Sequence, residues 1–447
     1  MKVLQITTRG IKNINKDLTI PFSNLVVSDG IKNINSVRGI YGYNGAGKSA
    51  FITSIELYRR LMIDRNYLLN DFNQRKLTKL LNFSINEFYF ESIFFDDKGD
   101  NKIYKHSLLL SYDELERRYY ISKEYFGSLE GRSLNDKEYS AIFTADEKLK
   151  LLPNVDKMVG KFYVENFNKF HGSTSINSLF LRMLVSVTAG TKNGDFDLGK
   201  IDDLLQLFIF VMSLHVYLLN EDRHEPKAFD ASKIFDLVKK VKDDEEKLLK
   251  SLQLMEGGNE FEDLVSKDQV SKYEKEAKRQ EEFIKIFKPE LNRIELTKKV
   301  DGNVIHCRKV FDYGKGVKVD LEYESSGIKH LLQLHRYLQN YIVGQIVFID
   351  EMDVNINSVY LCKLIDFLIN EGKGQLCFTS HNLEPMNSLK NSKAGICAIG
   401  YERNIDIWTK LGNKSPINEY MKGDFEHSPF NVEAFDFYAA FELEKDK

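Results

Sequence analysis

"GIYGYNGAGKSAFITSIEL" (residues 39–57) decides the fold, because a glycine-rich turn here joins a short apolar run to a helical pattern. Four of its residues satisfy the spacing G-x-x-x-x-G-K-[ST]: Gly42, Gly47, Lys48 and Ser49. Apolar residues recur near helical spacing from Ser49 to Met62, and "VRGIY" before the turn has strand character. Glycines let successive backbone N–H groups surround a phosphate, and the helix N-terminus adds positive charge. The stretch therefore predicts a phosphate-binding loop between a strand and a helix.

Within this loop, the lysine and the hydroxyl that follows it have separate expected roles. We expect Lys48 to bridge the β and γ phosphates of a nucleotide and Ser49 to offer its hydroxyl to Mg²⁺. The predicted nucleotide-binding residues of the loop are Gly42, Asn44, Gly45, Gly47, Lys48, Ser49 and Ala50. A chance glycine-rich turn is the alternative, and the flanking strand and helix favour nucleotide binding over it.

Two later apolar runs end in polar residues. "IVFIDE" (346–351) has the form of a buried parallel strand, after which Asp350 is expected to hold Mg²⁺ through water and Glu351 to polarise the attacking water. "FTSHN" (378–382) closes the next such run and predicts that His381 reaches the γ-phosphate or the attacking water. Acidic turns and a histidine at strand ends are also common for structural reasons. Their combination with the phosphate-binding loop favours the catalytic interpretation.

A fourth element is "YESSGIKHLLQL" (323–334), in which Ser325, Ser326 and Gly327 stand at the start of an amphipathic helix. The hydroxyls and the free N–H groups of such a helix start form a second anion site. Taken alone, this pattern indicates only a helix N-cap.

Composition excludes several classes of protein. The 447 residues contain 63 Lys and Arg against 66 Asp and Glu, so the formal charge is −3 and no globally basic, nucleic-acid-coating surface is predicted. Any DNA contact would be a local patch. Four cysteines without CxxC spacing favour a reduced, cytoplasmic protein. The most apolar stretch, 204–219, is too short to span a bilayer, so it predicts a buried helix and no membrane partner.

The order of the patterns predicts one split α/β domain with an insertion. An N-terminal hairpin and antiparallel strands between 86 and 126 come first, and the chain from 130 to 290 has a charged, helical character. Strands and helices then alternate through the two polar-ended runs. We expect four units: the first part of the head at 1–128, a helical insertion at 129–292, the second part of the head at 293–400 and a C-terminal extension at 401–447.

Together, the phosphate-binding loop, "SSG" before a helix, "FIDE" and "SHN" resemble the ABC-type ATPase head of RecF, SMC proteins and the overcoming-lysogenization-defect ATPases. The resemblance implies an α/β fold with a mixed sheet, an antiparallel β subdomain and a helical insertion. It also implies ATP and Mg²⁺ as cofactors and hydrolysis of ATP to ADP and phosphate. In that family the signature acts in trans, so Ser325, Ser326 and Gly327 would complete the site of a second subunit. A homodimer around sandwiched ATP, or a higher oligomer, follows.

The same resemblance places three further residues. "MDVNINS" (352–358) matches the loop that crosses the interface between heads, with Asp353 and Asn355 as its contacts. Lys12 in "RGIKNI" stands where a basic residue of the family approaches the nucleotide, although Gly10 and Ile11 replace the usual Asn-Phe. The family's Q-loop glutamine has no clear counterpart, and Gln74 is the nearest candidate.

The chain resembles stand-alone ATPases of bacterial anti-phage systems of the PARIS type and the lactococcal abortive-infection type. The insertion is too short for a long coiled coil, and the tail after His381 is too short for a TOPRIM nuclease, so we expect no nuclease domain in this chain. The resemblance implies an ATP-driven sensor or scaffold that holds, releases or activates a separately encoded TOPRIM-like or RloB-like nuclease effector in response to a phage-encoded trigger. Candidate partner surfaces are the charged helices at 233–285 and the tail at 424–447.

Two other functions remain open. A RecF-like ATPase of DNA repair or recombination would bind DNA across the head dimer, and near-neutral charge weighs modestly against it. A nucleotide-gated scaffold without turnover is the third function, and the intact Glu351 weighs against it.

Overall fold

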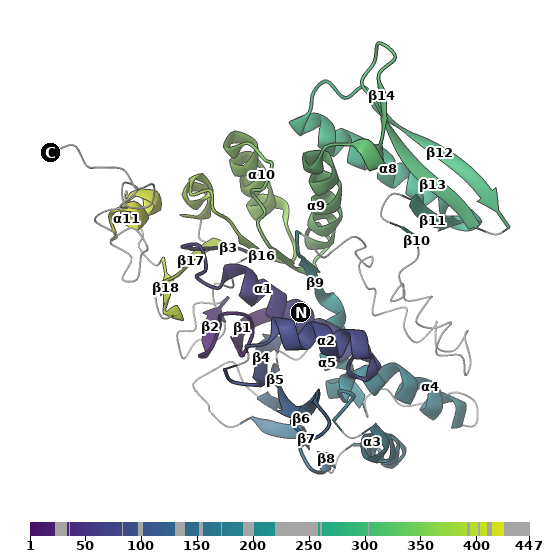
Figure 1. The fold of residues 1–447 in the computed structure, drawn as a ribbon, viewed down its shortest axis with the longest axis vertical. Helices are drawn as coiled ribbons and strands as arrows, with labels where there is room; N and C mark the ends of the chain where they lie inside the picture. Colours follow the sequence, from purple (N-terminus) through teal and green to yellow (C-terminus); the bar gives the residue numbers. More distant parts are fainter. Residues whose placement is uncertain are drawn as a thin grey trace.

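Three β-sheets organise the described part of the chain (Figure 1). This computed structural model describes residues 1–22, 34, 36–82, 84–96, 102–129, 139–151, 155–170, 172–190, 201–219, 258–259, 262–302, 304–390, 394–400, 403–408 and 414–423.

The central sheet has six strands in the order β18-β17-β3-β16-β15-β9. Their bounds are Ile405–Ile407, Ala394–Ile399, Val37–Gly42, Gln375–Thr379, Ile346–Ile349 and Leu214–Tyr217. All neighbouring pairs are parallel except β17 with β18. Strands β15 and β16 are buried throughout, which explains their unbroken apolar sequences.

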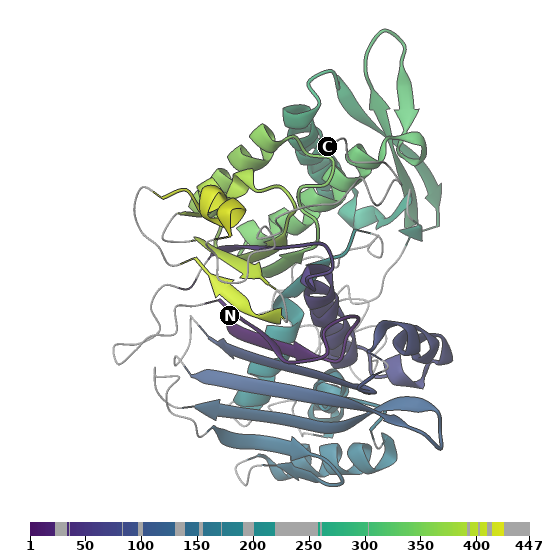
Figure 2. The ribbon, with the colours of Figure 1, turned by 60° about the vertical axis from the view of Figure 1, so that its left-hand side comes forward.

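Helices cover both faces of this central sheet (Figures 1 and 2). One face carries α1 (Lys48–Ile63) and α5 (Asp202–Ser213), and the other carries α9 (Ser326–Ile342) and α10 (Ser358–Glu371). These positions match the helices that the apolar spacing predicts after the glycine-rich loop and on both sides of "IVFIDE".

The second sheet is antiparallel and has seven strands in the order β2-β1-β4-β5-β6-β7-β8. The bounds are Leu18–Pro21, Lys2–Arg9, Glu87–Phe95, Ile103–Asp113, Arg118–Leu129, Ser140–Ala145 and Leu149–Leu151. Buried and half-buried residues alternate along β4, so one face packs on the core. Helix α1 lies between the two sheets in Figure 2. Tyr58 of α1 stacks on Phe90 of β4 with ring centroids 4.1 Å apart. The predicted fold class, with a mixed sheet and an antiparallel β subdomain, is confirmed.

Several shorter elements complete these layers. Beside the antiparallel sheet lie η1, α2, α3, η2 and α4, with bounds Tyr67–Leu69, Asp71–Leu80, Lys157–Phe170, Asn177–Leu179 and Phe180–Gly190. Beyond β16 come η7 (Glu384–Lys390) and α11 (Pro416–Lys422). Among the described residues, no helix combines the length and the hydropathy that crossing a bilayer requires.

Several stretches of the predicted helical insertion are strands, namely β7, β8, β9, β10 (Gly258–Asn259) and β11 (Glu262–Ser266). The apolar run 204–219 was expected to be one buried helix, but α5 ends at Ser213 and Leu214–Tyr217 forms β9. β9 pairs in parallel with β15, and all four of its residues are buried, so the open edge of the central sheet outweighs local helical preference. β7 and β8 likewise extend the antiparallel sheet and bury Phe143. The boundaries of the four units stay predictions.

The third sheet projects from the molecule at the upper right of Figure 1. It contains β10 (Gly258–Asn259), β11 (Glu262–Ser266), β13 (Val304–Asp312) and β12 (Arg293–Asp301) in that order, and β14 (Lys318–Asp320) pairs with β13. The 3₁₀ turns η5 (Lys267–Gln269) and η6 (Leu321–Tyr323) follow β11 and β14. α8 (Val270–Phe287) is the described part of the charged helices expected at 233–285. The charged stretch 233–257 and the tail 424–447 lie outside the described residues.

A half-buried carboxylate joins this third sheet to α9, the helix that begins with the signature. Asp263 on β11 accepts hydrogen bonds from Lys309 Nζ at 2.7 Å and from Tyr273 Oη at 2.6 Å, and Arg336 of α9 approaches it at 3.4 Å. Burial raises the pKa of Asp263, but the two cations outweigh burial and hold the pKa well below its usual range. The projecting sheet is therefore connected electrostatically to the signature helix.

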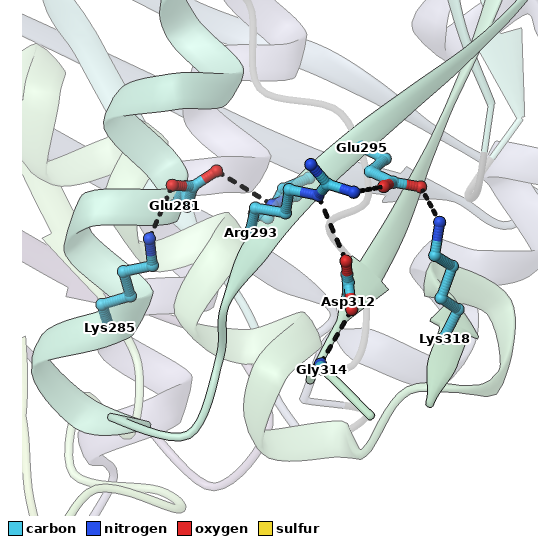
Figure 3. Close-up of polar contacts among 8 residues, drawn as sticks. Glu281, Lys285, Arg293, Glu295, Asp312, Gly314 and Lys318 are labelled. Carbon is cyan, nitrogen blue, oxygen red and sulfur yellow. Dashed lines mark hydrogen bonds and ion pairs between the residues drawn. The ribbon is translucent and has the colours of Figure 1, made fainter. Parts of the chain in front are cut away.

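A second carboxylate fixes α8 against β12, as Figure 3 shows. Glu281 is only 3% exposed and accepts hydrogen bonds from Lys278 Nζ at 2.5 Å, from Lys285 Nζ at 2.7 Å and from the Ile294 amide at 2.9 Å. Beside it, Arg293 pairs with Glu295 and Asp312, and Lys318 pairs with Glu295. Burial raises the pKa of Glu281, but these donors lower it to about 2.

We predict that Glu281→Gln lowers the free energy of unfolding by about 1–3 kcal/mol at pH 7, because the charge-assisted hydrogen bonds are lost. A depressed pKa stabilises the fold above the unfolded value, and this stability is lost as the pH falls toward 2. The difference between wild type and variant should therefore shrink between about pH 4.5 and pH 2. Denaturant unfolding across this range measures it. The matched control is Glu282→Gln on the same helix, whose side chain is 69% exposed and should cost under about 0.5 kcal/mol.

Candidate functional site

The glycine-rich loop connects β3 directly to α1. Gly42, Gly45 and Gly47 have φ values of 153°, 82° and 110°, a backbone region that side chains with a Cβ rarely adopt. Gly47 is the N-cap of α1, so Lys48 is its first residue and Ser49 its second. The loop and the N-terminus of a 16-residue helix thus converge where the sequence predicts a phosphate.

Lys48 is buried beneath this loop. Its Nζ donates to the carbonyl oxygens of Gly42 at 2.8 Å and Tyr43 at 3.2 Å. Burial lowers the pKa of Lys48, while the carboxylates of Asp350 and Glu351 act in the opposite direction. The Lys48 ammonium group therefore has neutral acceptors that an anion can replace. It also lies close enough to Asp350 and Glu351 for their charges to act on it.

The other predicted loop residues are arranged around Lys48. Asn44 and Gly45 are exposed at the tip, and Ser49 is half-buried on the first turn of α1. Ala50 is 3% exposed, so only its backbone amide is suited to a ligand.

The two acidic residues follow β15 at the same edge of the sheet. Thr379, the last residue of β16, donates its hydroxyl to Asp350 Oδ1 at 2.7 Å and accepts from the Glu351 amide at 2.7 Å. Thr379 is fully buried, and Glu351 has a φ of 52°. One hydroxyl thus orients the Asp350 carboxylate and the backbone from which the Glu351 side chain leaves. Sequence reasoning missed Thr379 because a threonine that ends a buried strand has no distinguishing motif.

His381 and the loop after Glu351 lie together. Asp353 Oδ2 accepts hydrogen bonds from the backbone amides of His381 at 3.1 Å and Asn382 at 3.0 Å. The predicted interface residue Asp353 is thereby bonded within its own chain, where it fixes the turn that carries His381. The His381 residue is exposed.

The signature residues stand at the open start of α9. Ser325 is the N-cap, and its Oγ accepts from the Ile328 amide at 3.4 Å. Ser325 and Ser326 are both exposed. A Cβ added at Gly327 would lie 3.4 Å from Asn355 Cβ, so the predicted interface loop touches the signature within one chain. The signature residues therefore lie at the start of α9, whereas the loop that holds Lys48 lies at the start of α1.

Lys12 approaches the loop from the N-terminal segment. Its φ is 47°, and its Nζ donates to Thr53 Oγ1 of α1 at 2.9 Å. Gly10 lies two residues before Lys12 and has a φ of 85°, and a Cβ there would lie 1.7 Å from the Glu87 carbonyl oxygen, so the backbone at this position requires glycine. The adjacent Asn13 side chain donates to the carbonyl oxygen of Gly45.

Gln74, the nearest candidate for a Q-loop glutamine, uses its side-chain amide in hydrogen bonds to the backbone of Leu68 and Tyr119. Its Nε2 donates to the Leu68 and Tyr119 carbonyl oxygens at 2.8 and 3.0 Å, and its Oε1 accepts from the Tyr119 amide at 2.8 Å. The side chain is buried and anchors α2 to β6.

Two groups near the loop, the Ser49 hydroxyl and the Asp350 carboxylate, could serve as ligands of a hydrated magnesium ion. No cluster of three or more His, Cys, Asp or Glu side chains that could bind a metal occurs within the described ranges. Mg²⁺ keeps several waters and takes one or two protein ligands together with phosphate oxygens. The Ser49 hydroxyl and the oriented Asp350 carboxylate fit such a ligand set.

Comparisons with known proteins give one family that matches most of the chain. The profile of the family described as "AAA domain, putative AbiEii toxin, Type IV TA system" matches residues 38–387. No curated protein matches the chain.

Solved structures with a similar fold include SMC heads and RecF. An Smc head from Pyrococcus furiosus, bound to the C-terminal domain of ScpA, has 12% identity and a TM-score of 0.41, covering 95% of this chain and 99% of that one. An SMC head from Thermotoga maritima has 11% identity and a TM-score of 0.35, covering 92% and 100%. RecF with ATP has 13% identity and a TM-score of 0.39, covering 91% and 98%.

These TM-scores lie below 0.5, so the solved structures carry no functional conclusion. The family profile, by contrast, spans well over half of the chain and includes the loop around Lys48 and the acidic pair after β15. The chain therefore belongs to the family described as "AAA domain, putative AbiEii toxin, Type IV TA system".

Proposed function

We propose that this chain binds ATP with Mg²⁺ and hydrolyses it to ADP and phosphate. The supporting observation is the meeting of three strand ends. Lys48 begins the helix after β3, the acidic pair follows β15, and Thr379 of β16 orients that pair. A buried lysine on neutral carbonyls, near the oriented Asp350 carboxylate and the neighbouring Glu351, is suited to a magnesium triphosphate.

Each residue has a role consistent with its position. Lys48 exchanges its carbonyl acceptors for β and γ phosphate oxygens, while loop amides surround the phosphates. Ser49 and Asp350 would hold a magnesium ion, which would supply positive charge to the phosphates. Glu351 accepts a proton from the attacking water, and His381 lies on the neighbouring turn, suited to hydrogen-bond the γ-phosphate.

We further propose that two chains are needed for turnover. The exposed Ser325 and Ser326 sit at a helix N-terminus whose amides can bind an anion, and they face outward from their own chain. ATP would favour a closed homodimer because only closure brings one chain's signature to the γ-phosphate held by the partner's loop. Hydrolysis removes that contact and reopens the dimer. A higher oligomer is compatible with the same contact.

We propose that this cycle serves as the sensor or scaffold of an anti-phage, abortive-infection system in the cytoplasm. The closed dimer would hold, release or activate a separately encoded toxic nuclease of the TOPRIM-like or RloB-like class after a phage-encoded trigger arrives. The matching family's description, which names a toxin of a type IV system, supports this role. A RecF-like role in DNA repair is the alternative, because the four sequence motifs resemble those of RecF as well.

We predict that Lys48→Ala abolishes ATP binding, because the buried cation is lost from the loop. Glu351→Gln should keep binding but trap a closed dimer, because the water is no longer activated. Light scattering with ATP measures the difference. Equal dimerisation of the two variants would contradict the proposal.

We predict that Thr379→Val lowers kcat about 10- to 100-fold with little change in KM, because the valine keeps the shape but frees the Asp350 carboxylate. Thr379→Ser retains the hydroxyl and is the matched control. Phosphate release measures turnover, and thermal unfolding checks that both variants are folded. A valine variant with wild-type kcat would show that the hydroxyl does not position the acidic pair.

We predict that duplex DNA leaves the ATPase rate within about twofold of its basal value at both low and moderate salt. A RecF-like enzyme would instead show stimulation by DNA that falls steeply as salt rises. Strong, salt-sensitive stimulation would favour the repair function over the defence function without affecting the assignment as an ATPase.

A further inference from the structure

Arg403 lies beside the glycine-rich loop, next to Tyr43 and Gly47, although it is 355 residues after Lys48 in the sequence. It occupies the turn between β17 and β18, with a φ of 69°. The turn arrives there because β17 pairs in parallel with β3, with Ile399 opposite Gly42. The chain therefore leaves β17 at the same edge of the sheet where the glycine-rich loop leaves β3.

The Arg403 side chain contacts two segments, the glycine-rich loop and the N-terminal segment around Asn13. Its Nη1 donates to Tyr43 Oη at 3.1 Å, and its Nη2 donates to the Asn13 carbonyl oxygen at 3.1 Å. Its Cδ would lie 3.7 Å from a Cβ placed at Gly47. Its Nε is buried without a hydrogen-bond partner among the described residues. A guanidinium group with neutral acceptors and a spare buried donor is therefore held against the loop.

Two more cations near the loop have neutral acceptors. Lys48 Nζ donates to carbonyl oxygens of the loop, and Lys12 Nζ donates to the Thr53 hydroxyl. Within the part of the chain that the structure describes, Lys12, Lys48 and Arg403 form no ion pair with a carboxylate within 4.0 Å. Three cations from three distant segments thus lie around the loop and the first turns of α1 without a direct ion pair among the described residues, an arrangement suited to a ligand with several negative charges.

We propose that Arg403 is a further nucleotide-binding residue that contacts the phosphate chain. This inference rests on the proposed function and adds a ligand from a segment that sequence motifs do not identify. On binding, the guanidinium group exchanges a neutral acceptor, the Tyr43 hydroxyl or the Asn13 carbonyl, for a phosphate oxygen. Arginine is suited to this exchange because hydrogen bonds between a guanidinium and a phosphate are charge-assisted and roughly twice as strong as neutral ones.

The experiment measures binding of the non-hydrolysable ATP analogue AMP-PNP with Mg²⁺ by calorimetry. Arg403→Gln should weaken binding about 10- to 100-fold, the usual effect of losing a charge-assisted hydrogen bond to phosphate. Arg403→Lys should regain part of this loss, because a point charge still attracts phosphate. Thermal unfolding without nucleotide checks folding, and the lysine variant keeps the test informative if the glutamine variant is unstable.

The matched control is Arg117→Gln. Arg117 is exposed in the β5–β6 turn and has a φ of 53°, so this substitution removes the same charge from a similarly left-handed backbone. It should leave the Kd of AMP-PNP unchanged.

Three results would overturn the inference or its basis. A folded Arg403→Gln protein that binds within about twofold of wild type would show that Arg403 does not contact the nucleotide, while the ATPase proposal would stand. A lysine variant as weak as the glutamine variant would indicate stacking on the base instead of contact with phosphate. If wild type and Arg117→Gln both fail to bind AMP-PNP, the proposed function itself is wrong.

Discussion

The parallel pairing of β3, β16 and β15 is the constraint on which the site depends. Carboxyl ends of parallel strands meet at one edge, so residues far apart in sequence are brought together there. This pairing places Lys48 beyond the end of β3, Thr379 at the end of β16 and the acidic pair beyond β15. β17 obeys the same rule on the other side of β3 and brings Arg403 to the loop. The order of the strands in the sheet thus determines where the charged residues of the site lie.

The same arrangement separates the two halves of the proposed catalytic unit. The loop that holds Lys48 lies at the start of α1, whereas Ser326 lies at the exposed start of α9 on the other face of the sheet. Helix α9 is also tied through Arg336 to Asp263 in the projecting sheet. A contact made by Ser326 with a second chain would therefore act on a helix that is bonded to the projecting sheet.

Residues within short motifs could be predicted from sequence because their spacing is local. The glycine-rich loop, the helix after it and the strand before Asp350 have the expected structure. Partners set by distant pairing could not be predicted. Thr379 looks like any threonine in a buried strand until β16 is placed beside β15, and Arg403 has no motif at all. Leu214–Tyr217 continues an apolar helical pattern, and only the open edge of β15 makes it a strand.

The central claim is that each nucleotide site is completed by a second copy of this chain. Its most direct test mixes two inactive variants, Lys48→Ala and Ser326→Arg, and measures phosphate release. Heterodimers contain one site in which an intact loop faces an intact signature. The account predicts that the mixture recovers about a quarter of wild-type activity, because about half of the dimers are mixed and each has one working site. A mixture as inactive as its components, with mixed dimers shown to form, would contradict it.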